Sequence, residues 1–237
     1  QPGPVELRCG NLGGGGFASN PVLGIRHRGI IGRERQKLAK EIRDGCQVEK
    51  SDNWLRLGNP WEIPRPKLAF DVNLGGRTQS YLDDHGEYRV RWEPDRVVRG
   101  VACDVPVVGF GVETTNLLRL WKAEAPESFD FAAFNTGDYY AAVNEKVVSE
   151  NLTKVLYPND EPEAGKELRL AQQYFLVSCS LQDMVRLYRQ FHDDFGAFHK
   201  KFAVQLNDTH PALAIPELMH LLVDRHHVTW DRAWEVT

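Results

Sequence analysis

The stretch A-V-Q-L-N-D-T-H-P-A-L-A-I-P-E-L-M, from Ala203 to Met219, predicts a strand, a polar loop and a helix in that order. Apolar residues alternate from Phe202 to Leu206, which is the period of a half-buried strand, and an apolar helical pattern follows Pro211. Asp208 or Thr209 suits the cap of that helix, and proline suits its first turn because no donor is needed there. The stretch therefore indicates an α/β arrangement.

The polar loop of this stretch is a candidate binding site. In an open α/β sheet, ligands bind at the carboxyl ends of the strands, so Asn207, Asp208 and His210 are expected to face a crevice. The alternative is that Asp208 and Thr209 only cap the helix, and the pattern favours neither reading.

The same stretch resembles the α-glucan phosphorylases, the family of glycogen, starch and maltodextrin phosphorylases. Six further blocks resemble that family in the same order along the chain. They are Q-V-E-K-S-D-N-W-L-R-L-G-N-P-W-E (Gln47 to Glu62), L-R-L-W-K-A-E-A-P (Leu118 to Pro126), F-N-T-G-D-Y (Phe134 to Tyr139), L-T-K-V-L-Y-P-N-D (Leu152 to Asp160), G-K-E-L-R-L-A-Q-Q-Y-F (Gly165 to Phe175) and W-D-R-A-W-E-V-T (Trp230 to Thr237).

The resemblance implies part of the amino-terminal doubly wound α/β domain of a two-domain, GT-B-like glycosyltransferase. Residues 1–46 form an irregular, glycine-rich segment in which the family pattern degrades, and residues 47–237 match the middle of that domain. The carboxyl-terminal cofactor domain of the family is absent from these 237 residues.

Periodicity divides the chain into a strand-rich first half and a helical second half. Period-two alternation predicts strands at 68–74 and 88–92, apolar runs predict strands at 97–108 and 117–121, and Gly75-Gly76 offers a two-residue hairpin turn. Helical spacing follows at 129–134 and 138–156, and Gly165 to Phe191 is expected to form one long helix.

The resemblance implies phosphorolysis of terminal α-1,4-linked glucose by inorganic phosphate, giving α-glucose 1-phosphate. The family holds pyridoxal phosphate on a lysine within a motif resembling E-A-S-G-x-S-x-M-K, and no such motif occurs here. Because the cofactor carries the chemistry, this chain alone is expected to be inactive. The alternative is a truncated, non-catalytic glucan-binding or interaction module.

Two loops match substrate-binding positions of the family. Asp160 matches an aspartate of the loop that gates the catalytic cleft, and Glu161 stands where relatives carry asparagine. Asp208 and His210, with the adjacent Asn207, match positions that line the sugar pocket. Without the resemblance, Asp160 would be read as part of an ordinary acidic linker.

Two further matches concern phosphate and regulation. C-G-N-L-G-G-G-G-F-A places Asn11, Gly13 and Gly15 on matching positions of the family's phosphate-handling glycine loop, although the helix that follows it in relatives is missing here. Arg186 matches the first of two arginines that contact an activating nucleotide in animal relatives, but Leu187 replaces the second.

Composition excludes several classes of function. A net charge of −4 gives no basic surface for nucleic acid. No apolar run reaches the length of a membrane span, and the first 16 residues lack the layout of a signal peptide. A cytoplasmic protein is therefore expected. The four cysteines are expected to be free thiols, and the histidines and acidic turn at 83–85 give no expected metal site. A homodimer is possible, as in the family.

Overall fold

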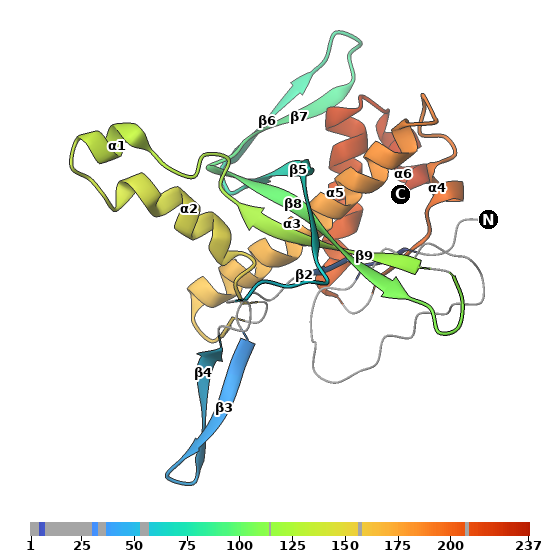
Figure 1. Ribbon diagram of the computed structural model, residues 1–237. Helices are drawn as coiled ribbons and strands as arrows, with labels where there is room; N and C mark the ends of the chain where they lie inside the picture. Colours follow the sequence, from blue (N-terminus) through green and yellow to red (C-terminus); the bar gives the residue numbers. More distant parts are fainter. Residues whose placement is uncertain are drawn as a thin grey trace.

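The structure is a computed structural model that describes residues 5–7, 30–32, 37–52, 57–113, 115–155, 158–206 and 209–237. It has a mixed α/β architecture in which strands dominate the first half and helices the second (Figure 1). This order agrees with the periodicity of the sequence. The predicted domain boundary at residue 46 is not tested by it.

The central sheet has six strands in the order β10-β1-β2-β9-β8-β5. Its parallel part contains β10 (Val204–Leu206), β1 (Val5–Leu7), β2 (Ile30–Gly32) and β9 (Thr115–Glu124). Its antiparallel part adds β8 (Arg96–Val108) and β5 (Ile63–Leu74). The predicted strands at 68–74, 97–108, 117–121 and 202–206 are therefore confirmed, with small differences at their ends.

Helix α3 (Glu163–Arg189) packs against this sheet and forms the centre of the hydrophobic core. The side chains of α3 that face the sheet are buried, including Phe175, Cys179 and Leu181. Gly100 of β8 allows the close approach of the helix, because a Cβ atom there would lie 2.2 Å from the sulfur of Cys179. A larger residue at position 100 would have to push α3 away from the sheet.

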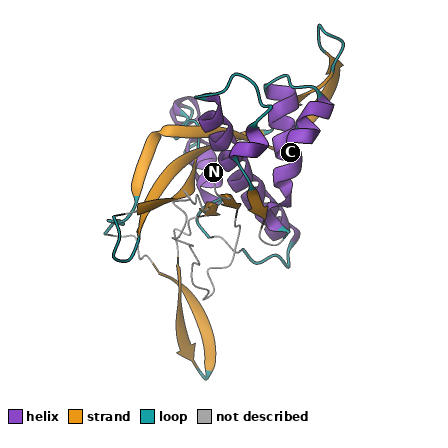
Figure 2. Cartoon of the chain, turned by 90° about the vertical axis from the view of Figure 1, so that its right-hand side faces the viewer, coloured by secondary structure: helices purple, strands orange, loops and turns teal. Residues whose placement is uncertain are grey.

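Two antiparallel hairpins project from the body of the molecule (Figures 1 and 2). They are β3 (Lys37–Arg43) with β4 (Cys46–Asp52), and β6 (Arg77–Leu82) with β7 (Tyr88–Glu93). Gly75 and Gly76 do form a turn with positive φ angles, but β5 pairs with β8 and not with β6. The predicted hairpin across these glycines is wrong, because the longer β5–β8 pairing buries the apolar face of β5 against α3.

The remaining helices surround the sheet and α3. In chain order they are α1 (Phe131–Asn135), α2 (Ala141–Asn151), α4 (Phe198–Lys201), the 3₁₀ turn η2 (His210–Leu213), α5 (Ala214–His220), the π-helical turn η3 (Leu221–Arg225) and α6 (Trp230–Val236). The helix predicted to begin at Pro211 thus starts as a 3₁₀ turn and continues as α5. The side chain of Thr209 does not cap it.

The described residues also bear on the cysteines, on membrane spans and on metal ligands. Cys46, Cys103 and Cys179 are free, as predicted, whereas Cys9 lies outside the described part of the chain. Within that part, no helix combines the length and apolar character needed to cross a membrane. The same residues contain no cluster of three or more potential metal ligands, and the acidic turn uses Asp83 to accept hydrogen bonds from backbone amides.

Candidate functional site

The carboxyl end of β10 lies next to the carboxyl end of β1. The two strands are parallel and pair in register, with Leu206 opposite Leu7. The predicted site residues Asn207 and Asp208 follow Leu206 directly, and the glycine loop follows β1 within a few residues. Asn207, Asp208, Asn11, Gly13 and Gly15 lie outside the described residues, so their predicted roles stay predictions.

His210 is the first residue of η2, where the chain leaves the sheet edge and turns into α5. Pro211 follows at the first turn of this 3₁₀ segment and is buried. Its fixed φ angle suits a helix start, and its missing N–H costs nothing there. The turn packs against α3, which brings the His210 ring to the first turns of that helix.

The acidic loop, residues 158–162, connects α2 to α3 on the same side of α3. The side chain of Asn159 accepts a hydrogen bond from the backbone N–H of Glu161, which closes a local turn. Gly165, in the first turn of α3, lies directly beneath the loop, because a Cβ atom there would be 1.8 Å from the carbonyl oxygen of Asn159. The sequence therefore permits the loop backbone to lie against the helix only because residue 165 is glycine.

Arg169 of α3 brings Asp160 and His210 together. One guanidinium nitrogen forms an ion pair with the Asp160 carboxylate, and the other lies 3.4 Å from Nε2 of His210. The arginine side chain is mostly buried, at 22% exposure, whereas the Asp160 side chain is 47% exposed. Two residues that are 50 positions apart in the chain thus meet on one arginine.

An open hollow of about 330 Å³ lies beside these side chains. Its lining consists of Asp160, Lys166, Arg169, Leu170, Gln173, Thr209 and His210. The lining is rich in polar groups that suit a hydroxylated ligand, because carboxylates accept hydrogen bonds, ammonium and guanidinium groups donate them, and imidazole can do either.

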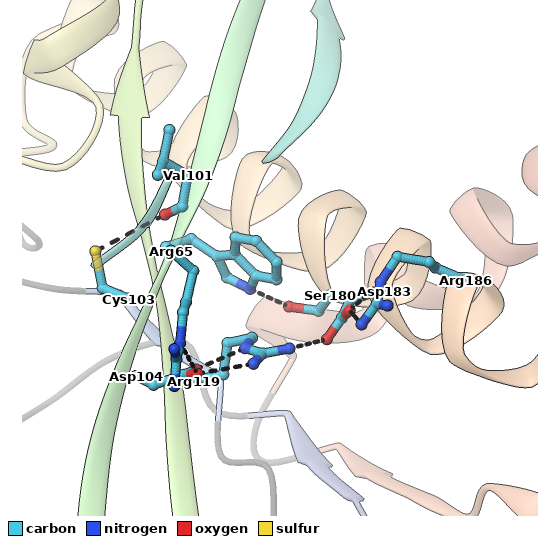
Figure 3. A network of polar contacts seen from close by, with 9 residues as sticks. Arg65, Val101, Cys103, Asp104, Arg119, Ser180, Asp183 and Arg186 are labelled. Atoms are coloured by element: carbon cyan, nitrogen blue, oxygen red, sulfur yellow. Dashed lines mark hydrogen bonds and ion pairs between the residues drawn. The ribbon is translucent and has the colours of Figure 1, made fainter. Parts of the chain in front are cut away.

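The predicted regulatory residue Arg186 lies elsewhere on α3. Seventeen residues separate Arg169 from Arg186, which corresponds to about 25 Å along the helix. Both Nε and Nη2 of Arg186 donate to Oδ1 of Asp183, at 2.9 and 2.7 Å, and Asp183 also accepts from Arg119 of β9 at 2.7 Å (Figure 3). Arg186 therefore belongs to a network inside the fold and not to the hollow.

This network, made of Asp104, Arg119, Asp183 and Arg186 with Arg65 at its edge, joins the sheet to α3. Burial of the Asp104 carboxyl favours its neutral form, but the hydrogen bonds and charges of Arg119 and Arg65 outweigh this effect, so the pKa of Asp104 is lowered. Burial disfavours the charged form of Arg119, yet Asp104 and Asp183 raise its pKa. Asp104 and Arg119 therefore both keep their charges at neutral pH.

Sequence reasoning placed Asp160 and His210 in one site but missed Arg169. A signal was available: Arg169 lies four residues after Gly165, which puts it on the same face of the helix as the glycine that touches the loop. A basic residue on a helix face that meets an acidic loop is a candidate partner for that loop.

Comparisons with known proteins agree with the resemblance seen in the sequence. A family model described as carbohydrate phosphorylase matches residues 24–237. A glycogen phosphorylase of Synechocystis is 62% identical over 198 residues, covering 84% of this chain and 23% of the relative. Glycogen phosphorylases of Chlamydia pneumoniae and of sheep liver are each 46% identical, covering 84% of this chain and 24% of the relative. The chain spans about a quarter of the length of these relatives.

Proposed function

Because this chain belongs to the carbohydrate phosphorylase family, we propose that it forms one wall of the substrate cleft of an α-1,4-glucan phosphorylase. The whole enzyme would cleave the terminal α-1,4 bond with inorganic phosphate and release α-glucose 1-phosphate. The observation that carries the proposal is the meeting of Asp160 and His210 on Arg169 beside a polar hollow. The names of the relatives favour this enzyme over a non-catalytic binding module.

We assign binding roles to the residues of this wall. Asp160 accepts hydrogen bonds from glucosyl hydroxyls, His210 donates to or accepts from a neighbouring hydroxyl, and Asn207 and Asp208 extend the same surface at the end of β10. Glu161 adds a second carboxylate at the rim, where relatives carry an amide, and it is expected to disfavour anions near the loop.

The glycine loop is the proposed phosphate-facing part of this wall. Its residues Asn11, Gly13 and Gly15 follow β1, and β1 is the neighbour of β10 in the sheet. Exposed backbone N–H groups at such a position bind anions well. Phosphate and the terminal glucose would therefore meet where the two parallel strands end.

Pyridoxal phosphate would be held outside this chain. Lys166 lines the hollow, but its ammonium group is exposed and forms an ion pair with Glu163 at 3.0 Å. A lysine that carries an imine needs a dry surrounding, so the exposed Lys166 does not fit this role. We therefore assign the cofactor's lysine to another part of the parent polypeptide.

The larger assembly is part of the same proposal. A doubly wound amino-terminal domain facing a second domain would complete the cleft, in a cytoplasmic enzyme that forms a homodimer. Arg186 carries little of a nucleotide site, because its guanidinium already holds Asp183 and Leu187 offers no second cation.

A chimeric enzyme tests the proposal directly. Residues 24–237 would replace the matching segment of the Synechocystis glycogen phosphorylase, and glucose 1-phosphate released from glycogen would be measured. The chimera is expected to be active. His210→Ala should lower kcat/KM by about 10- to 100-fold, which corresponds to a lost hydrogen bond of about 1.5–3 kcal/mol.

The control is His199→Ala, which removes an exposed imidazole on α4 and should leave kcat/KM unchanged. A folded chimera that releases no glucose 1-phosphate would contradict the proposed activity. Equal effects of the two substitutions would contradict the role of His210.

A further inference from the structure

One face of α3 fastens the segment that contains the acidic loop. Gly165, Arg169 and Gln172 are spaced by four and three residues, so they lie on the same side of the helix. Gln172 donates from Nε2 to the carbonyl oxygen of Val155 at 2.6 Å, ahead of the loop. Gly165 touches the carbonyl of Asn159, and Arg169 pairs with Asp160. The segment is thus held at three successive points.

The three contacts differ in strength and in what would break them. Gly165 and Gln172 are buried, and both contact backbone carbonyls, Gly165 that of Asn159 in the loop and Gln172 that of Val155 ahead of it. The contact of Arg169 is a charge pair with a half-exposed carboxylate, and such a pair is weakened by salt. Arg169 is therefore the contact that a ligand or a competing charge can most easily release.

Arg169 also fixes the chemistry of His210. A guanidinium group carries only donors, so Nε2 of His210 must accept in this contact. The ring proton of the neutral imidazole is then on Nδ1. Through Arg169, the position of the acidic loop determines which nitrogen of His210 can donate to a ligand.

We propose that Arg169 is a positioning residue that latches the acidic loop to His210, so that Asp160 and the Nδ1–H form of His210 are presented together. This inference rests on the proposed function for its ligand, the glucosyl end of an α-1,4-glucan. When the loop leaves α3, Arg169 loses the Asp160 carboxylate that orients its guanidinium, and the guanidinium is then free to turn away from Nε2 of His210. Loop closure and the correct imidazole form are thereby a single event.

Hydrogen exchange of the full chain tests the latch. Arg169→Gln and Asp160→Asn should each speed exchange of the loop amides by about fivefold, because an exposed ion pair contributes that much. The double variant should be no faster than either single variant, since both remove the same contact. Raising the salt concentration to about 1 M should speed loop exchange in the wild-type chain by less than either substitution does, because the Arg169 side chain is only 22% exposed.

Lys166→Gln is the matched control, because it removes a cation from the same turn of α3 whose partner is Glu163 and not Asp160. It should leave loop exchange unchanged. If it speeds exchange as much as Arg169→Gln, or if the two single effects add in the double variant, there is no specific latch. Should Arg169→Gln fail to fold, Asp160→Asn provides the same comparison.

The second measurement is the ¹⁵N spectrum of the His210 ring, assigned with His210→Gln. The wild-type spectrum should show the Nδ1–H form, Arg169→Gln should shift the ring toward Nε2–H, and Arg169→Lys should restore loop exchange better than it restores the ring form. A ring spectrum that Arg169→Gln does not change overturns the proposal. Both readouts use no phosphorolysis, so an inactive chimera with a coupled loop would reject the proposed function alone.

Discussion

Two arginines form ion pairs in different surroundings, Arg119 between β9 and α3 and Arg169 between α3 and the acidic loop. Arg119 lies between sheet and helix, 10% exposed, with Asp104 and Asp183 at 1% and 5% exposure. Arg169 lies at the surface of the same helix and pairs with a carboxylate that is 47% exposed. Both arginines hold two segments together, but only the second does so beside a hollow.

The difference follows from what surrounds each pair. Arg119 uses Nε and Nη2 on Asp104 and Nη1 on Asp183, at 2.7 to 2.9 Å, and solvent has almost no access to these groups. Removing Arg119, Asp104 or Asp183 would leave the opposite charge buried without its partner, which is costly in folding free energy. Around Arg169 water can replace a lost partner at little cost. The buried network is therefore suited to holding the fold, and the surface cluster is suited to exchanging a carboxylate for a ligand.

The sharpest test of this comparison is Arg119→Met. Removing one member of a buried ion network typically costs about 3–5 kcal/mol, and the lower end is expected here because Arg65 and Arg186 still contact the two carboxylates. Chemical unfolding would measure the change in the free energy of unfolding. Arg99→Met is the control, since it breaks an exposed ion pair with Asp71 on the same sheet and should cost less than about 1 kcal/mol.

Equal losses in the two variants would contradict the distinction between buried and exposed pairs. A loss below about 1 kcal/mol for Arg119→Met would mean that the network does not hold the sheet to α3.

A smaller effect is expected at Glu217, a buried carboxylate that faces α3 from α5. It accepts hydrogen bonds from the hydroxyls of Tyr174 and Ser178, both at 2.6 Å. Burial and the neighbouring Glu217 carboxylate raise the pKa of Tyr174, so its hydroxyl stays protonated and keeps donating. Tyr174→Phe should cost about 1–3 kcal/mol of unfolding free energy, because one carboxylate oxygen loses its donor.

The control for this variant is Tyr140→Phe, because the Tyr140 side chain is 89% exposed. It should change the unfolding free energy by less than about 0.5 kcal/mol. If Tyr174→Phe is equally mild, water must replace the lost hydroxyl, and the site would resemble the surface cluster more than the buried network.

The sequence predicts the local elements of this fold well, but it does not predict the contacts between distant elements. The strand at 202–206 and the long helix follow from local periodicity, and the structure confirms both, with small differences at their ends. The pairing of β5 with β8 does not, because local turn chemistry at Gly75-Gly76 favoured a hairpin while burial against α3 decided the partner. Which strand pairs with β5 depends on burial across the whole sheet, so the sequence of β5 alone does not predict its partner.

The candidate site shows the same limit. The family resemblance predicts Asp160 and His210 as binding residues, and the structure brings the two side chains together on Arg169. Arg169 was missed because it lies within a regular helix, where a single basic residue normally faces solvent. Arg186 was predicted as a regulatory contact, but the partner that occupies it, Asp183, lies three residues before it and is itself held by a distant strand. The three-residue spacing of Asp183 and Arg186 could have indicated their pairing, but nothing in the local sequence indicates that Arg119 of β9 holds Asp183.

Acid should weaken the buried network. The pKa of Asp104 is lowered in the folded chain, mainly through Arg119 once the opposing effect of burial is overcome. Its stabilising contribution is therefore complete above the unfolded aspartate pKa of about 3.9 and is lost as the pH falls through the lower folded value. Unfolding measured between about pH 5 and pH 3 should show a steeper loss of stability for the wild-type chain than for Asp104→Asn. Parallel losses would show that Asp104 carries no such linkage.

Arg169→Gln is expected to have the smallest effect on global stability, in contrast to Arg119→Met in the buried network. The variant removes an ion pair that solvent already screens, so the unfolding free energy should change by less than about 1 kcal/mol. Chemical unfolding with a probe in the core, such as the fluorescence of the buried Trp121, would measure it. The same variant should nevertheless change loop exchange and the His210 ring form. A loss as large as that of Arg119→Met would place Arg169 among the residues that hold the fold, and the loop effects would then follow from general unfolding.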